Sequence, residues 1–317
     1  MFRYIVKRVL LIIPILFAVA FIVYAILALT PGDPGRILLG MSATQEAVDQ
    51  LNEQLGATGP FLVRFYNYIY NIMTKFDFGL SYRTQMPVFD EIAIRFPVSL
   101  TLASLGLIFQ TILGVSAGVF SAVKQYSKAD VTLTIVAMLI ASVPVFWLGL
   151  MLILVFSVKL GLLPSNGVGT WRHYVLPLVG VTLPGAAHVL KLTRSAMLET
   201  IRQDYVRTAR AKGAGEAVVI WGHAFKNAML PIITSLSMNF SFLLGGTVLT
   251  ESVFSIPGLG SGVVTAIRNK DIPQVLAIVL LIAAFFCILM LLVDIAYSIA
   301  DPRIKARFAR SRKGGGF

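Results

Sequence analysis

Residues 205–231 read Y-V-R-T-A-R-A-K-G-A-G-E-A-V-V-I-W-G-H-A-F-K-N-A-M-L-P and form a long polar stretch between two apolar runs. The alanines of its first part favour a helix, and Gly213 and Gly215 predict the end of that helix and a bend. A second helical piece is expected from Glu216 onward. The stretch therefore predicts two short helices joined by a glycine turn.

The composition indicates the environment of this stretch. The chain has 317 residues, of which 57% are hydrophobic and only 13% charged, a balance typical of integral membrane proteins. The lone Cys287 lies in an apolar run, which excludes a disulfide framework and a cysteine-based metal site. A net charge of +12 would also suit nucleic acid, but the basic residues lie beside apolar runs, which favours orientation in a membrane.

Six apolar stretches are long enough to cross a hydrocarbon core of about 30 Å. They cover residues 9–29, 98–123, 131–158, 174–192, 228–249 and 273–299. The first could be a cleaved signal peptide, but it is longer than a signal core and no small-residue cleavage site follows it. The fourth is short and carries Pro177 and Pro184, which is typical of interrupted helices that line solute paths. The sequence predicts an all-α polytopic membrane protein with six transmembrane helices.

These stretches divide the chain into parts with different predicted surroundings. We expect a cytoplasmic start with the first transmembrane helix (1–30), a long helical extracytoplasmic segment (31–97), a transmembrane domain (98–300) with a cytoplasmic segment at 200–226, and a basic tail (301–317). The parts predicted to lie inside hold 18 of the 27 lysines and arginines, so both termini are expected in the cytoplasm. The 31–97 segment could pack on its own helices or receive a solute-delivering protein, and both alternatives stay open.

The polar stretch also resembles the cytoplasmic loop of ABC importer permeases, whose pattern is E-A-A, three residues and Gly, with Leu-Pro further on. Arg207 stands here in place of the glutamate, Thr208 in place of the first alanine, and the gap before Leu230-Pro231 is longer. These departures are typical of the peptide/nickel branch, in which Y-V-R-T-A-R-A-K-G is characteristic. The resemblance implies that the ATPase-contacting segment comprises Tyr205, Arg207, Thr208, Ala209, Arg210, Ala211, Lys212, Gly213 and Glu216.

The resemblance covers essentially the whole chain. Residues 30–34, 77–81, 96–99, 254–260 and 294–303 also look like the first permease subunit of ABC-type oligopeptide, dipeptide and nickel importers. Membership implies a type I ABC importer permease fold, a second homologous permease, two cytosolic ATPase subunits and an extracytoplasmic solute-binding protein. The sequence holds no G-x-x-x-x-G-K-[ST] phosphate loop, so ATP and Mg are expected on the ATPases. This chain is expected to be non-catalytic and to bind no cofactor or metal.

Three residues are candidates for the solute path. His188, Asn239 and Ser241 are polar points within apolar stretches, where polar groups are costly unless they face protein or water. For His188 the alternative is a buried histidine bonded to a neighbouring backbone group. Gly114 and Gly118, four residues apart, predict close helix packing within the chain.

The expected function is import of di- or oligopeptides by alternating access, with nickel, glutathione and oligosaccharides as alternatives. Peptide is favoured over nickel because no cluster of histidines or acids follows the apolar stretches. An intramembrane enzyme would need a nucleophile–base pair or a metal cluster, and His173, His188, His223 and Asp294 do not form one. A passive channel would have no use for the cytoplasmic segment.

Overall fold

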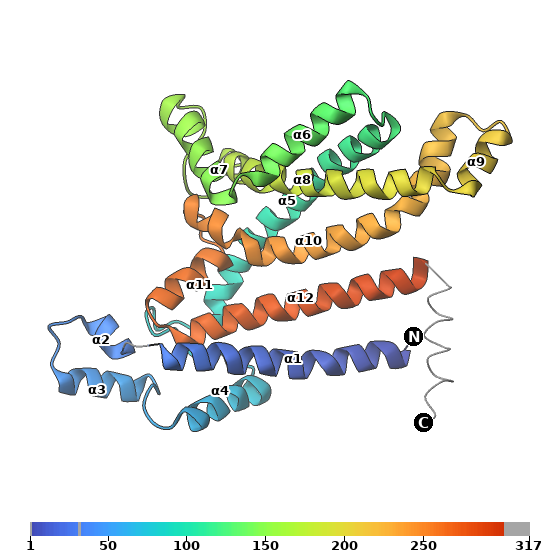
Figure 1. The fold of residues 1–317 in the computed structure, drawn as a ribbon. Coiled ribbons are helices and arrows are strands. Elements are labelled where there is room, and N and C mark those ends of the chain that lie inside the picture. Colours follow the sequence, from blue (N-terminus) through green and yellow to red (C-terminus); the bar gives the residue numbers. More distant parts are fainter. Residues whose placement is uncertain (1, 31–32, 301–317) are drawn as a thin grey trace. The chain divides into compact units, whose positions relative to one another are not determined.

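The computed structural model describes residues 2–30 and 33–300, drawn as coloured ribbon in Figure 1. The chain divides into two compact units. The first unit consists of Met1–Leu100 with Ser255–Cys287, and the second of Thr101–Phe254 with Ile288–Phe317. Every named element in the described residues is a helix, which confirms the all-α fold class. Two helices, α5 (Val88–Val123) and α12 (Ile272–Ala300), continue from one unit into the other.

In the first unit, aromatic side chains hold an amphipathic helix against the first apolar one. Phe61 and Phe65 of α4 meet Phe21 and Tyr24 of α1 in edge-to-face pairs with ring centroids 5.4–5.9 Å apart. Part of the 31–97 segment therefore packs on its own transmembrane helix, one of the two expected alternatives. The helices that lie wholly in this unit are α1 (Phe2–Leu29), α2 (Pro34–Leu39), α3 (Gln45–Gln54), α4 (Phe61–Lys75) and α11 (Leu259–Arg268).

Two buried carboxylates tie residues 77–91 to the start of α12 within the first unit. The Asp271 carboxylate accepts hydrogen bonds from the Ser81 hydroxyl and from the Gln274 backbone N–H, the latter at 3.3 Å. The Glu91 carboxylate accepts from the Thr84 hydroxyl and the Gln274 carboxamide. Buried charges need such partners, so this network fixes the segment that precedes α5.

The second unit is organised around α8 (Arg172–Ile201), which packs against α6, α7 and α10. In the apolar membrane interior, close packing depends on small residues. A methyl group added at Gly114 of α5 would lie 2.6 Å from Cβ of Val189, and one at Gly118 would lie 2.6 Å from Cβ of Thr193. The predicted close contact is confirmed, with α8 as the partner. The other elements are α6 (Lys128–Ser142), α7 (Val145–Leu152), η1 (Ile153–Lys159), α9 (Asp204–Ala211), η2 (Val218–Phe225) and α10 (Lys226–Val253).

The apolar helices agree only in part with the predicted spans. Four helices of the described chain are long and apolar enough to cross a membrane, or up to five if a bent pair counts as one span. That pair, α6 with α7–η1, bends by 95° at Pro144, where a single span was predicted. Val143 is extended, as the residue before a proline prefers. The count of six stays a prediction, because several side chains of α10 lie outside the described residues.

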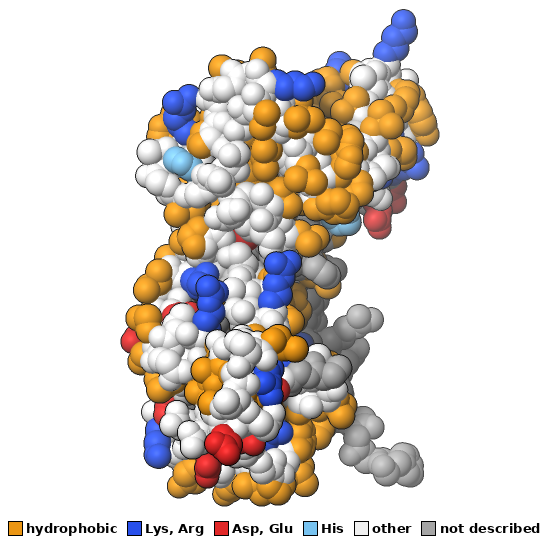
Figure 2. All heavy atoms as spheres, turned by 90° about the vertical axis from the view of Figure 1, so that its left-hand side faces the viewer, with side chains coloured by type: hydrophobic (Ala, Val, Ile, Leu, Met, Phe, Trp, Pro, Cys, Tyr) orange, Lys and Arg blue, Asp and Glu red, His pale blue; other side chains and the backbone are white. Residues whose placement is uncertain are grey.

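The prediction that residues 174–192 form a short, interrupted span was wrong. α8 is one helix of 30 residues that contains both Pro177 and Pro184. Each proline removes one backbone hydrogen bond, which a helix packed among neighbours tolerates. Many large apolar side chains of the described helices are exposed, as expected of a protein whose surroundings are lipid. On the face that Figure 2 draws, apolar side chains are interspersed with basic and acidic ones.

Candidate coupling segment and solute path

The predicted two-helix segment is present in the second unit. α9 (Asp204–Ala211) starts after the extended Gln203 and ends at Lys212. Gly213 has a φ of +81°, in the left-handed region that favours glycine, and a helical piece beginning with η2 (Val218–Phe225) leads directly into α10. The predicted glycine turn is confirmed at Gly213. Two residues separate the segment from the end of α8, and on its other side η2 runs into α10 without a break.

The segment has one face in the core and one face free. Val206, Ala209, Val219 and Ile220 are buried in a cluster that includes Met197 of α8. Of the predicted contact residues, Ala209 therefore packs inward. The other eight are exposed: Tyr205, Arg207, Thr208, Arg210, Ala211, Lys212, Gly213 and Glu216. Trp221 and Val218 add exposed apolar area, at 54% and 56%.

An ion pair closes the turn between the two helical pieces. Arg210 Nε lies 2.7 Å from Glu216 Oε1, and Arg210 Nη2 lies 3.2 Å from Glu216 Oε2. The hydrogen bond from Arg210 lowers the pKa of the Glu216 carboxyl, and the same bond raises the pKa of Arg210. Both side chains are exposed, so the pair bridges the two pieces but adds little stability.

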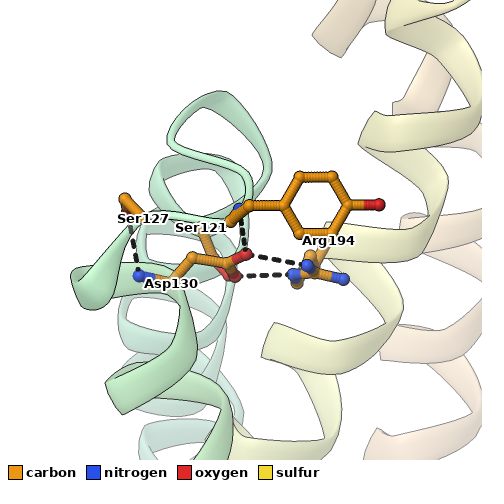
Figure 3. Close-up of polar contacts among 5 residues, drawn as sticks. Ser121, Ser127, Asp130 and Arg194 are labelled. Atoms are coloured by element: carbon orange, nitrogen blue, oxygen red, sulfur yellow. Dashed lines mark hydrogen bonds and ion pairs between the residues drawn. The ribbon is translucent and has the colours of Figure 1, made fainter.

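A second ion pair lies in the same unit but is enclosed (Figure 3). The carboxylate of Asp130, at the start of α6, accepts from Arg194 Nε at 2.7 Å and Nη2 at 2.8 Å. It also accepts from the Ser121 hydroxyl and the Tyr126 backbone N–H, so four donors surround one buried acid. This cluster joins the end of α5 and the start of α6 to α8, seven residues before α8 ends.

Two pockets border these elements. The first, of about 180 Å³, lies beside the coupling segment and is lined by residues that include Arg210, Glu216 and Leu198. The second, of about 260 Å³, lies between α5, α7, α8 and α10, and Asn239 is among its lining residues. Within residues 2–30 and 33–300, no three His, Cys, Asp or Glu side chains come together as a metal site would require.

Of the two predicted path residues whose side chains the structure describes, Asn239 lies at a cavity and His188 does not. His188 is exposed on α8 and does not line the larger pocket, so the alternative of a buried histidine bonded to backbone was wrong. The side chain of Ser241 lies outside the described residues. Asn239 does line the pocket.

Sequence reasoning missed Asp130, Arg194 and Gln110. Asp130 and Arg194 are 64 residues apart, and no local pattern links them. Gln110, a polar residue in the middle of the apolar stretch 98–123, carried a signal, because such a residue marks a function or an internal partner.

Comparisons with known proteins agree with these features. Residues 114–306 match the family "Binding-protein-dependent transport system inner membrane component", and residues 1–103 match its N-terminal family. The chain is 38% identical over 305 residues to the glutathione transport system permease protein GsiC of Escherichia coli (strain K12), covering 96% of this chain and 99% of that protein. GsiC of Shigella flexneri serotype 5b (strain 8401) shows the same identity and coverage.

Solved structures give the same fold at low identity. The MetNI methionine ABC transporter in an inward-facing conformation matches with a TM-score of 0.58 and 17% identity, over 66% of this chain and 96% of that chain. An amino acid ABC transporter with histidines matches with a TM-score of 0.51 and 15% identity, over 68% and 94%. The likeness concerns the fold alone and confirms the predicted fold class.

Proposed function

Because this chain belongs to the family of binding-protein-dependent transport system inner-membrane components, permease subunits of ABC importers, we propose that it carries peptides into the cell by alternating access. The family is a non-catalytic part of such importers. The observation that supports the proposal best is the exposed coupling segment, whose two helical pieces join α8 to α10.

The coupling segment suits the transmission of force. Its buried face is packed on α8, so a push on its exposed face is passed to α8 through that packing and to α10 along the chain. We infer that two cytosolic ATPases dock on that face and that ATP binding and hydrolysis on them reset the helices between inward-open and outward-open states. ATP and Mg stay on the ATPases, and they shift the equilibrium only by their different affinity for the two states.

The remaining partners follow from the same proposal. A second, homologous permease would complete the path, and an extracytoplasmic solute-binding protein would deliver the solute. The chain lies in the cytoplasmic membrane with several apolar helices, and we propose that the coupling segment and both termini face the cytoplasm, as the distribution of lysines and arginines favours. His188, Asn239 and Ser241 remain proposed path residues.

The solute is the finer part of the proposal. We favour di- and oligopeptides, since nickel would need soft or anionic ligands and none gather in the described chain. Glutathione is the alternative that the relatives favour, because they are named glutathione permeases. Oligosaccharide import by the same fold is a weaker alternative. Uptake of labelled dialanine, glutathione and nickel through the assembled importer distinguishes them.

The coupling role is tested by a matched pair of glycines. Gly213 has φ +81° and Gly215 does not, and an added Cβ has no neighbour within 4 Å at either position. A Gly213→Val change therefore strains the backbone, by about 1–3 kcal/mol. Gly215→Val adds a side chain of the same size without that strain. We expect Gly213→Val to assemble, with uptake and solute-stimulated ATP hydrolysis falling together by about tenfold.

Gly215→Val should keep most of both activities. Equal uptake by the two variants would contradict the coupling role of the turn. Co-purification of two ATPase subunits with the wild-type chain provides the independent check, and their absence from an active complex would overturn the proposal.

A further inference from the structure

The pocket of about 260 Å³ between α5, α7, α8 and α10 contains buried polar atoms without partners. Gln110 of α5 is 1% exposed and Thr250 of α10 is 3% exposed, and both line the pocket. Gln110 Nε2, Thr250 Oγ1 and Asn239 Nδ2 have no hydrogen-bond partner in the described protein. Native proteins leave few buried polar groups unpaired, so three around one cavity need an explanation.

Two of these groups lie near the middle of their helices, and Thr250 lies near the end of α10. Gln110 is near the midpoint of the apolar stretch 98–123, Asn239 near that of α10, and Gly185 near that of α8. A methyl group at Gly185 would lie 1.8 Å from Gln110 Oε1, so this glycine admits the Gln110 carboxamide between α5 and α8. In transporters, solute sites lie near the bilayer midplane, where irregular or small-residue packing makes room for them.

The chemistry of the pocket selects its ligand. A carboxamide offers both a donor and an acceptor, which matches the C=O and N–H of a peptide group. None of the lining residues is ionisable, so neither a metal cation nor a phosphate would find a counter-charge there. The volume of about 260 Å³ is below the ~300–1,000 Å³ of sites for whole drug-sized ligands, so the pocket would hold one part of a longer solute.

We propose that Gln110, Asn239 and Thr250 line a polar subsite that binds the peptide backbone of the solute inside this subunit, with Thr250 contacting a part of the solute about 16 Å along α10 from Asn239. The inference rests on the proposed importer function and deepens it. The hydrogen bonds between these side chains and the solute involve no charge. Such contacts suit a transport path, because a solute that must leave again cannot be held by strong ionic contacts.

The test uses apolar substitutions of matched shape in the complete importer. Gln110→Leu and Thr250→Val remove the pocket's polar atoms. Thr193→Val is the control, because Thr193 is 0% exposed and its hydroxyl is also unpaired, but it lies outside the pocket. Binding of labelled dialanine is measured on the detergent-solubilised complex with a non-hydrolysable ATP analogue, and dialanine uptake is measured in proteoliposomes with the binding protein.

We expect Gln110→Leu and Thr250→Val each to weaken dialanine binding by about three- to tenfold and to lower uptake per ATP hydrolysed. Thr193→Val should match the wild type. The thermal unfolding midpoints of the pocket variants should be unchanged or higher, since removing an unpaired buried group costs little.

Two results would overturn the subsite. One is that both pocket variants bind dialanine as tightly as Thr193→Val does, which would mean that the pocket holds water and not solute. The other is a fall of several degrees in their unfolding midpoints, which would assign the side chains internal partners. If the wild-type importer takes up neither dialanine nor glutathione, the proposed function itself fails, whatever the variants do.

Discussion

The two arginine–carboxylate pairs of the second unit have similar geometry and opposite surroundings. In both, Arg Nε lies 2.7 Å from a carboxylate oxygen and Nη2 makes a second bond, at 2.8 Å to Asp130 and 3.2 Å to Glu216. The Asp130 side chain is 3% exposed, however, and that of Glu216 is 68% exposed. Water and salt weaken the exposed pair, whereas the buried Asp130 carboxylate without Arg194 would keep only two neutral donors, the Ser121 hydroxyl and the Tyr126 N–H, and no counter-charge.

The difference assigns the pairs different tasks. The Asp130–Arg194 cluster holds α6 to α8 and would resist rearrangement, whereas Arg210–Glu216 can open and close at little cost. The permanent contact lies between membrane-spanning helices, and the exchangeable one lies on the surface that we propose for the ATPases. Four predictions test this contrast.

The largest effect is expected from Asp130→Asn. The amide removes the counter-charge of Arg194 and replaces one acceptor oxygen with an NH2 donor that faces other donors, so the free energy of unfolding should fall by about 2–4 kcal/mol. The thermal unfolding midpoint of the purified complex measures it. An Asp130→Leu/Arg194→Met double variant should recover most of the loss, and a single variant as stable as the wild type would remove the contrast.

A smaller loss is expected from Arg194→Lys. Lysine keeps the charge but cannot make both bonds to the Asp130 carboxylate, so the free energy of unfolding should fall by about 1 kcal/mol. Arg202→Lys is the matched control, because Arg202 is exposed on the same segment. If Arg194→Lys and Arg202→Lys unfold at the same temperature, the two hydrogen bonds from Arg194 to Asp130 contribute nothing to stability beyond the charge.

Glu216→Gln should leave the unfolding midpoint unchanged within error, because exposed ion pairs add little. Its effect should be local: cleavage of the turn around Gly213 by a protease should speed up a few-fold. Arg207→Gln serves as the control, since Arg207 lies 3.8 Å from Asp204 and holds no turn. A midpoint loss as large as that of Asp130→Asn would contradict the contrast.

The smallest effect concerns pH. The bond from Arg210 lowers the pKa of Glu216 from its ordinary value of 4.5, so the contact is fully formed above about 4.5 and is lost as pH falls through the lower, folded value. Protection of the turn, measured by limited proteolysis, should therefore be constant from about pH 8 to pH 5. Glu216→Gln should show no pH dependence of its own, and a wild-type transition near pH 6–7 would show that Arg210 does not hold the carboxyl.

The sequence predicted those features that have a local cause. Gly213 ends a helix because only a residue without a side chain enters the left-handed region easily, and glycines four residues apart predicted the α5–α8 contact. The membrane character followed from composition alone. The residues of the coupling segment came from a family pattern, and their contact with an ATPase stays a prediction.

The misses have a different physical origin. Pro144 and Pro184 look alike in sequence, yet the chain bends by 95° at the first and α8 continues through the second. Tertiary packing decides between the two, and it has no local signature. Asp130 and Arg194 are likewise paired only by the fold, and Gln110 gains its meaning from Gly185, 75 residues further on.

The two glycines of α5 have a mechanical consequence. With no room for even one carbon atom at either position, α5 can neither slide along α8 by a residue nor roll over it without collision. Within the second unit we therefore expect α8 and the adjoining part of α5 to move together as one rigid body. A displacement delivered at the end of α8 must therefore carry the neighbouring part of α5 with it, and any flexing of the path has to take place at other helix contacts.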